Sequence, residues 1–170
     1  GFGKLASKES VQVTDSEGKT AIYTAKNIIL ATGGRARQLP NLPIDNEKII
    51  GYRKAMSLEK QPKSIAIVGS GAIGVEFAYF YNAIGTQVTI IEYMPRIVPN
   101  EDADISKELL KSFKKAKMKV MTSAEVTGVD TSGEGCVVNI KTKKGEEQLT
   151  CDIVLSAVGV STNIEGIGLE

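Results

Sequence analysis

Residues 64–92 read SIAIVGSGAIGVEFAYFYNAIGTQVTIIE, and this stretch decides the fold. Its opening run, Ile65–Val68, is apolar and largely β-branched, which is typical of a buried strand in a parallel sheet. Gly69, Gly71 and Gly74 follow directly, in the spacing G-x-G-x-x-G. In this spacing the first glycine permits a tight turn, the second lets a pyrophosphate approach the backbone, and the third lets a helix pack closely on the strand. The stretch therefore predicts a nucleotide-binding turn.

A helix should begin after these glycines, with its unpaired N–H groups and the positive end of its dipole facing the phosphates. Gly85 lies where a glycine commonly caps the end of a helix. Four apolar side chains recur at helical spacing, and we expect them to face inward. They are Ile73, Phe77, Phe80 and Ile84.

A second predicted strand, Val88–Ile91, ends in Glu92. Glu92 lies 18 residues after Gly74, close to the separation of ~20 residues expected for an acid that binds a ribose 2′-hydroxyl. A carboxylate there accepts hydrogen bonds from the ribose diol and repels a 2′-phosphate, so the sequence favours NAD over NADP. Arg96, the only cation nearby in the sequence, lies beyond Pro95 and off the end of the strand. The alternative is a glycine turn that only packs a helix on a sheet.

Composition narrows the class of protein. The 170 residues suffice for one domain with a sizeable core and an appended piece. The formal net charge is +1, which gives no support for binding to nucleic acids or to membrane surfaces. No apolar run approaches the ~20 residues of a membrane span, and no signal-peptide pattern opens the chain, so we expect a cytoplasmic protein. The chain has no histidine, the commonest general acid–base residue, and we predict no catalytic residue within it.

Cys136 and Cys151 are the only cysteines, and they form neither a C-x-x-C pair nor a metal-ligand cluster. Both lie in runs that predict strands, where a cysteine acts as a small apolar filler. A disulfide between adjacent strands is geometrically open but is not expected in a reducing cytoplasm. The sequence thus predicts no metal site.

Before the glycine turn, strand-like runs alternate with turns. Val11–Thr14 and Ala21–Thr24 predict a β-hairpin, and Asn27–Ala31 predicts a further apolar strand. Gly33–Pro62 contains three prolines and little periodicity. We interpret that stretch as a linker between two domains, with one short helix near Ser57–Lys60.

After Glu92 the pattern first stays helical and then becomes alternating. Asn100–Lys117 predicts a helix that is acidic at its start and basic at its end, as the helix dipole favours. Lys119–Met121 predicts a third strand, and Ile153–Val158 predicts another buried strand. Between them a three-stranded meander replaces the next helix of a plain Rossmann unit. Its predicted strands are Val126–Asp130, Val137–Lys143 and Glu147–Cys151.

The expected fold class is therefore α/β: a Rossmann-like parallel sheet with helices and an inserted three-stranded β-meander, plus an N-terminal β segment. Two other functions fit part of this pattern. A methyltransferase that uses S-adenosylmethionine also places a glycine turn and a strand-end acid around an adenosine, but Gly74 and the meander argue against it. A non-catalytic nucleotide-binding module is the second alternative, which a pair of redox cysteines upstream in the parent gene would exclude.

Taken in order, several blocks of this sequence resemble the flavin-dependent pyridine nucleotide–disulfide oxidoreductases. They are GFGK at 1–4, NIILATG at 27–33, LP at 39–40, GSGAIGVEFA at 69–78, VTIIE at 88–92, AEVTGV at 124–129 and CDIVLSAVG at 151–159. The run VSTN at 160–163 departs from the G-R-x-P-N common in that family. The blocks that carry the family's main flavin motif, its redox-active cysteine pair and its interface domain have no counterpart here. The resemblance therefore implies a central fragment, which we expect to be inactive alone.

The resemblance also implies a division of the chain. Residues 1–40 would be the end of the first FAD-domain segment, 41–62 a linker, 63–160 the NAD-binding domain, and 161–170 the return toward the FAD domain. The strand near Ile29 would lie in the flavin domain's sheet. Without the other strands of that sheet, we expect residues 1–40 to associate with the C-terminal tail or with a second copy of the chain, or else to lack fixed structure.

Matched by position, the resemblance assigns roles to individual residues. Glu76 would lie beside the nicotinamide, Glu92 would hold the adenosine ribose, Val126 would touch the adenine, and the backbone of Gly159 would approach the nicotinamide. The residues that would wrap the NAD pyrophosphate and reach toward the nicotinamide are Gly69, Ser70, Gly71, Ala72, Ile73, Gly74, Val75 and Glu76. The residues that would approach FAD are Gly3 and Gly33, both of which also fit simple turn glycines.

The activity implied by the resemblance is hydride transfer from reduced FAD to NAD in an enzyme that oxidises dihydrolipoamide. The implied partners are the lipoamide-bearing component of 2-oxo acid dehydrogenase complexes and, for the full-length enzyme, a second copy in a homodimer. A disulfide, peroxide or mercuric reductase of the same family stays an alternative, because the substrate contacts of the family lie outside these residues.

Overall fold

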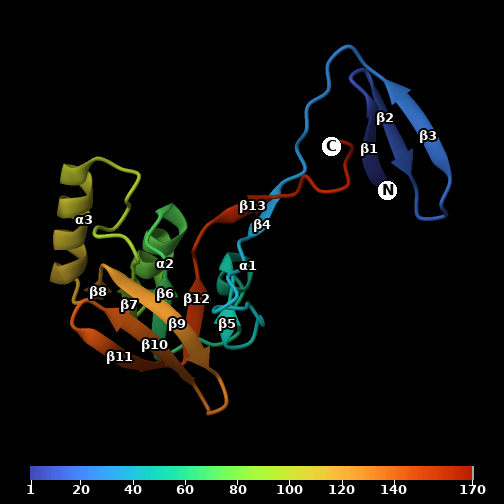
Figure 1. Cartoon of the computed structure of the whole chain (residues 1–170). Helices are drawn as coiled ribbons and strands as arrows, with labels where there is room; N and C mark the ends of the chain where they lie inside the picture. Colours follow the sequence, from blue (N-terminus) through green and yellow to red (C-terminus); the bar gives the residue numbers. More distant parts are fainter. Residues whose placement is uncertain (170) are drawn as a thin grey trace. The chain divides into compact units, whose positions relative to one another are not determined.

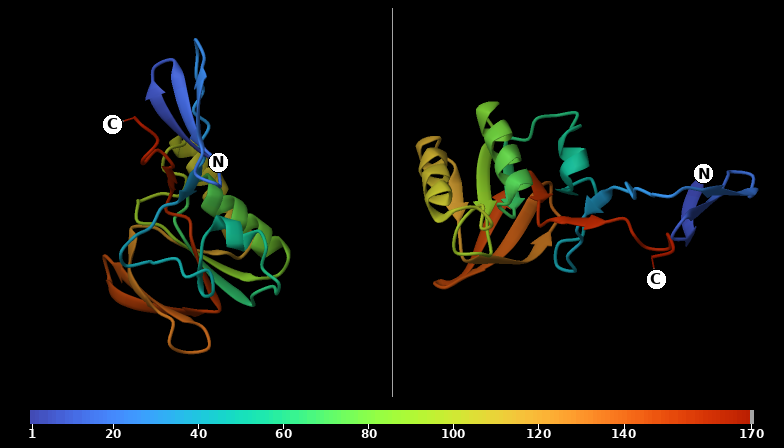
Figure 2. Two further views of the ribbon diagram at one scale, coloured as in Figure 1. Left: turned by 90° about the vertical axis from the view of Figure 1, so that its right-hand side faces the viewer. Right: turned by 90° about the horizontal axis from the view of Figure 1, so that it is seen from above.

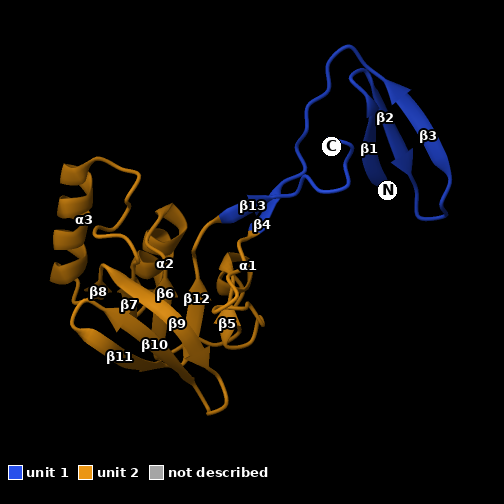
Figure 3. Cartoon of the chain, in the orientation of Figure 1, with its two compact units in different colours: residues 1–35, 160–170 blue, residues 36–159 orange. Residues whose placement is uncertain are grey.

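A computed structural model describes residues 1–169 of the chain. The chain divides into two compact units, coloured separately in Figure 3. Unit 1 comprises Gly1–Arg35 together with the segment from Val160 to the C-terminus, and unit 2 comprises Ala36–Gly159. Each unit contains sheets of its own and is described by itself.

Unit 2 is built on a parallel sheet whose strand order is β5-β12-β6-β7-β8 (Figure 1). The strands are β5 (Ile49–Ile50), β6 (Ser64–Val68), β7 (Gln87–Ile91), β8 (Lys119–Met121) and β12 (Ile153–Ser156). The strand before the glycine-rich turn, β6, is central and is buried from Ile65 onward. This confirms the predicted parallel sheet and explains why its strands read as continuous apolar runs, since both faces of the sheet are covered.

Alternate side chains of each strand enter two different cores. Ile65 and Ile67 of β6 point to the face covered by helices, whereas Ala66 and Val68 point to the face covered by the meander. The helices are α1 (Tyr52–Ala55), α2 (Ala72–Ala83) and α3 (Ala103–Lys115). The meander consists of β9 (Ala124–Asp130), β10 (Cys136–Thr142) and β11 (Gly145–Cys151), paired antiparallel in the order β11-β10-β9. Figure 2 shows the resulting layers of helices, sheet and meander, and the predicted α/β fold with its inserted meander is confirmed.

The inner face of α2 differs from the predicted one. Its buried residues are Gly74, Ala78 and Tyr81. Of the four predicted side chains, Phe77 is half-buried and packs against the core, whereas Phe80 is 52% exposed and Ile84 is 44% exposed. The reason is the contact at Gly74, where an added Cβ would lie 2.1 Å from the carbonyl oxygen of Gly69. This close packing on the turn fixes the rotation of the helix about its axis. The buried positions are therefore shifted by one residue along the sequence from those that hydrophobicity alone suggests. The predicted cap is present, since Gly85 has a φ of +97° and donates its N–H to Asn82.

The stretch interpreted as a linker contributes to unit 2. Ile49 and Ile50 of β5 pair with Val154 and Leu155 of β12 and are buried. The predicted helix near Ser57–Lys60 is wrong, because the helix of this stretch is α1 at Tyr52–Ala55. Short elements of two and four residues leave too little periodicity to be located from sequence.

Unit 1 contains an antiparallel sheet of β1 (Phe2–Ser7), β2 (Ser10–Thr14) and β3 (Thr20–Thr24). The predicted hairpin is formed by β2 and β3, and β1 adds a strand that the sequence analysis missed. The predicted strand at Asn27–Ala31 is wrong: these residues form no strand, and Ile29 is 91% exposed. An apolar run becomes a buried strand only when neighbouring strands pair with it and cover it. Among residues 1–169, no strand pairs with Asn27–Ala31.

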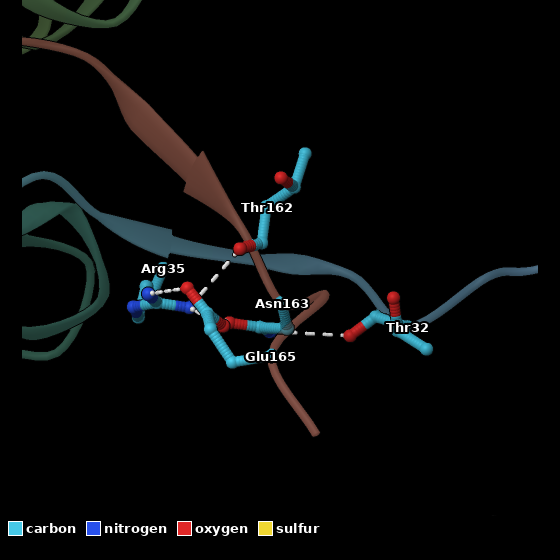
Figure 4. A network of polar contacts seen from close by, with 5 residues as sticks. All are labelled: Thr32, Arg35, Thr162, Asn163 and Glu165. Carbon is cyan, nitrogen blue, oxygen red and sulfur yellow. Dashed lines mark hydrogen bonds and ion pairs between the residues drawn. The ribbon is translucent and has the colours of Figure 1, made fainter. Parts of the chain in front are cut away.

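The C-terminal tail closes unit 1. The N–H of Leu5 in β1 donates to the carbonyl oxygen of Ile167 over 2.7 Å, and Ile167 is buried. The association of residues 1–40 with the tail, one of the expected outcomes, is thus present. A two-stranded sheet joins β4 (Gly34–Ala36) to β13 (Val160–Thr162). Beside it, Arg35 forms an ion pair of 2.6 Å with Glu165 (Figure 4).

Candidate functional site

A cleft of about 600 Å³ opens in unit 2 at the carboxyl ends of its central strands. Val68 at the end of β6, Ile91 at the end of β7 and Ala157 just after β12 all line it. Ligands of open parallel α/β sheets bind at this edge, where the strand order changes direction. In this sheet the change falls between β6, which leads outward to β7 and β8, and β12 on its other side.

The three glycines of the turn have three different surroundings. Gly69 has a φ of +96°, which side chains disfavour, and a Cβ there would lie 2.5 Å from the carbonyl oxygen of Ala157. Gly74 packs the helix on the turn, as described above. Gly71 lines the cleft, and a Cβ added to it meets no atom of the described chain within 4 Å. The space beside Gly71 is therefore open to a ligand that approaches the backbone closely.

The N-terminus of α2 is directed to this open space. Gly71 is the N-cap, and within the described residues no side chain caps the helix and no acid lies in its first turn. The first helical hydrogen bond runs from the N–H of Val75 to the carbonyl oxygen of Gly71. The N–H groups of the first turn, together with the positive end of the helix dipole, form a site suited to phosphate oxygens.

Glu92 lies across the turn, buried to 6% exposure at the end of β7, and lines the cleft. Its Oε2 accepts hydrogen bonds from the backbone N–H of Ser70 at 2.8 Å and from the Ser70 hydroxyl at 2.5 Å. Its Oε1 accepts one from the N–H of Met94 at 2.7 Å. Since each carboxylate oxygen accepts about two hydrogen bonds, Oε1 keeps one acceptor position for a hydroxyl group in the cleft.

Another wall of the cleft comes from residues 37–42, which the sequence analysis divided between the end of the FAD-domain segment and a linker. The N–H of Arg37 donates to the carbonyl oxygen of Gly159 over 3.0 Å. The side-chain amide of Asn41 donates to the carbonyl oxygen of Val126 over 2.5 Å. Both contacts join residues about a hundred positions apart, and no local sequence pattern signals them. Apolar side chains complete this wall at Leu39 and Leu42.

The cations near the cleft also differ from expectation. Arg96, the one considered from sequence, donates its guanidinium to the carbonyl oxygens of Pro99 and Glu101 and does not line the cleft. Arg37 is exposed and is the one cationic side chain among the cleft-lining residues within the described chain. Arg37 therefore adds a cationic residue to the cleft lining, at a position that sequence reasoning missed.

Only some of the predicted site residues lie in the cleft. Those that line it are Gly69, Ser70, Gly71, Glu92, Val126 and Gly159. Those on α2 that do not line it are Ala72, Ile73, Gly74, Val75 and Glu76. The two predicted FAD contacts, Gly3 in β1 and Gly33 with a φ of +73°, belong to unit 1.

The cleft fits a dinucleotide better than it fits a metal. The open space at Gly71 and the uncapped helix suit a pyrophosphate, and the remaining acceptor of Glu92 suits a ribose hydroxyl. No group of three or more metal-ligating side chains occurs among residues 1–169. Cys136 and Cys151 face one another across β10 and β11 as buried free thiols, and burial raises the pKa of Cys151 to about 12. Their high pKa values suit the predicted role of apolar filler rather than reactive thiols.

The parallel sheet, its glycine-rich turn and the cleft at the strand ends define a Rossmann-like α/β domain. The chain belongs to the pyridine nucleotide-disulphide oxidoreductase family, whose model matches residues 3–170. Members of this family use FAD and NAD(H). Family membership removes the methyltransferase alternative.

The comparisons with individual proteins agree with this assignment. The chain is 46% identical over 149 residues to dihydrolipoyl dehydrogenase of Rhizobium etli, covering 87% of this chain and 31% of that protein. It is 37% identical to leghemoglobin reductase of Glycine max, covering 100% of this chain and 33% of that protein. The crystal structure of LpdA from Mycobacterium tuberculosis superposes with a TM-score of 0.86 at 28% identity, over 99% of this chain and 38% of that one. The chain thus spans about a third of the length of the curated relatives it matches.

Proposed function

We propose that this chain is the NAD-binding part of a flavin-dependent disulfide oxidoreductase of the dihydrolipoyl dehydrogenase type. The observation that carries the proposal is the placement of Glu92. Its buried carboxylate lies on the cleft beside the glycine-rich turn, with one acceptor position left on Oε1. That position suits a ribose 2′-hydroxyl donor and opposes a 2′-phosphate, whose oxygens carry negative charge.

In the proposed complex, Gly71 and the first turn of α2 bind the pyrophosphate, while Glu92 accepts from the adenosine ribose. The adenine lies in the apolar part of the cleft near Val126, and the exposed backbone at Gly159 faces the nicotinamide. Glu76, one turn into α2, lies beside the nicotinamide in this proposal. When bound, NAD supplies the carbon that accepts a hydride from reduced FAD. The protein's contribution is to bind the dinucleotide and orient its nicotinamide.

The proposal extends to the protein of which such a chain is a part. In this proposal Gly1–Arg35 is the end of a first FAD-domain segment, Ala36–Gly159 the NAD-binding domain, and the segment from Val160 the return toward the FAD domain. The proposed partners are the lipoamide-bearing component of a 2-oxo acid dehydrogenase complex and a second copy in a homodimer. Within residues 1–169, none of the helices has the length and apolar character needed to cross a bilayer, and a cytoplasmic location stays a prediction.

A second candidate is a reductase of the same family with another acceptor. The similarity to leghemoglobin reductase, at 37% identity, supports this second candidate. A reductase that acts on a peroxide or a mercuric substrate belongs to the same group of alternatives. Both candidates place NAD in the same cleft, so they differ only in parts of the protein beyond this chain's cleft.

Calorimetric titration of the chain with NADH and with NADPH tests the proposal. We expect NADH to bind more tightly, because Glu92 accepts from the ribose diol. Glu92→Arg should narrow or reverse the preference, because it replaces the acceptor by a cation that pairs with a 2′-phosphate. Tighter binding of NADPH by the wild-type chain, or no binding of either nucleotide, contradicts the proposal.

A further inference from the structure

Ser70 occupies the first variable position of the glycine-rich turn, and all three of its polar groups are used within the protein. Its N–H and its hydroxyl both donate to Oε2 of Glu92, at 2.8 and 2.5 Å. Its carbonyl oxygen accepts from the N–H of Val98 at 2.9 Å. Ser70 is 0% exposed, so neither its hydroxyl nor its N–H is available to a phosphate in the cleft.

This arrangement gives Ser70 a different role from that of the neighbouring glycines. Hydrogen bonds to an ionised acceptor are short and about twice as strong as neutral ones, and Oε2 receives two of them from one residue. The two donors saturate Oε2 and hold the carboxylate plane in one orientation. Only Oε1, which accepts from Met94, keeps an acceptor direction toward the cleft.

We infer that Ser70 is a positioning residue for Glu92 and that, through Glu92, it sets the discrimination between NADH and NADPH. A carboxylate held in this way accepts from a diol and presents fixed negative charge to a 2′-phosphate. Without the Ser70 hydroxyl, Oε2 loses one of its two donors. The carboxylate then turns more freely and is less well oriented toward the ribose diol, which weakens the binding of NADH. This inference rests on the proposed binding of NAD in this cleft.

The test compares Ser70→Ala, Glu92→Gln and the double variant in the full chain, by calorimetric titration with NADH and NADPH. Ser70→Ala should narrow the ratio of the two dissociation constants by about tenfold, the effect of losing one hydrogen bond to a charged group. In the Glu92→Gln background the same substitution should leave the ratio unchanged, because the carboxylate through which Ser70 acts is gone.

Thr86→Ala is the matched control. Thr86 is 2% exposed, and its hydroxyl donates to the carbonyl oxygen of Pro62 over 2.9 Å, away from the cleft. Thr86→Ala should lower the free energy of unfolding, as Ser70→Ala does, while it leaves the ratio of the NADH and NADPH dissociation constants unchanged. Ser70→Cys has a slightly larger side chain and offers only a weak S–H donor. It replaces Ser70→Ala in the test if that variant does not fold, and it should narrow the ratio in the same direction.

A second readout needs no nucleotide. In chain labelled with ¹³C in glutamate, the carboxyl resonance of Glu92, assigned by its loss in Glu92→Gln, should shift in Ser70→Ala and stay in place in Thr86→Ala. Three results overturn the inference. The first is a Glu92 resonance that does not shift in Ser70→Ala. The second is a folded Ser70→Ala with an unchanged ratio of the NADH and NADPH dissociation constants, and the third is an equal change of that ratio with and without the Glu92 carboxylate. Failure of the wild-type chain to bind NADH instead contradicts the proposed function, and the resonance still decides the role of Ser70.

Discussion

Gly71 and Gly74 belong to one motif but are required for different reasons, which substitution can separate. A Cβ at Gly71 meets no atom of the described chain within 4 Å, and its φ of −68° suits any residue. Gly71→Ala should therefore fold with near wild-type stability and bind NADH at least tenfold more weakly, because the methyl occupies the space proposed for the pyrophosphate. A Cβ at Gly74 would lie 2.1 Å from the carbonyl oxygen of Gly69. Gly74→Ala should lower the free energy of unfolding by about 1–3 kcal/mol.

Urea unfolding and NADH titration of the two variants measure both effects. An unstable Gly71→Ala, or a Gly71→Ala that binds NADH with unchanged affinity, would contradict this division of roles. The sequence alone predicted the motif, the tight turn at Gly69 and the close packing at Gly74, whereas the role of Gly71 beside a pyrophosphate stays a prediction. It missed Arg37 and Asn41, because their contacts to Gly159 and Val126 depend on how distant segments meet in space.

At the scale of elements, the buried phenol of Tyr81 links α2 to α1. The hydroxyl of Tyr81 donates to the carbonyl oxygen of Ala55 over 2.6 Å, and Tyr81 is 2% exposed. Tyr81→Phe leaves that carbonyl without its donor, so it should lower the free energy of unfolding by about 1 kcal/mol. Tyr79→Phe, on the 68% exposed neighbour, is the control and should change it by less than about 0.5 kcal/mol. Equal values for the two variants in urea unfolding would show that the Tyr81 hydroxyl does not stabilise the helix pair.

The elements also mark where sequence reasoning succeeds and fails. Parallel strands buried on both faces read as apolar runs, and the meander reads as alternation, so both were predicted from residues alone. The inner face of α2 was misplaced because a backbone contact at Gly74, rather than hydrophobicity, sets the rotation of the helix. The strand expected at Asn27–Ala31 has the right composition but no neighbouring strand, and pairing is not a local property.

At the scale of the whole molecule, the closure of unit 1 should depend on pH. Hydrogen bonding to Arg35 is the main cause that lowers the pKa of Glu165 to about 2, against an ordinary value of 4.5. Because the folded pKa lies below the unfolded one, the stabilisation is complete above pH 4.5 and is lost as the pH falls toward 2. Both side chains are exposed, so the effect should be confined to local opening of the tail.

Hydrogen exchange at the N–H of Leu5, which is bonded to Ile167, reports this opening. Protection in the wild-type chain should exceed that in Glu165→Gln at pH 6, and the two should converge near pH 2. Equal protection at pH 6 would mean that the ion pair does not hold the tail.

The hydrogen bond between Arg37 and Gly159 has a consequence for protein engineering. It places the entry and the exit of residues 36–159 side by side, so this segment leaves and rejoins the rest of the chain at nearly one point. Every residue that lines the cleft falls inside it. Such a segment should fold and bind on its own. Expressed alone, residues 36–159 should bind NADH with a dissociation constant within about threefold of that of the full chain, measured by calorimetric titration, because no residue that lines the cleft is removed. If residues 36–159 fold but do not bind NADH while the full chain does, then unit 1 contributes to the site.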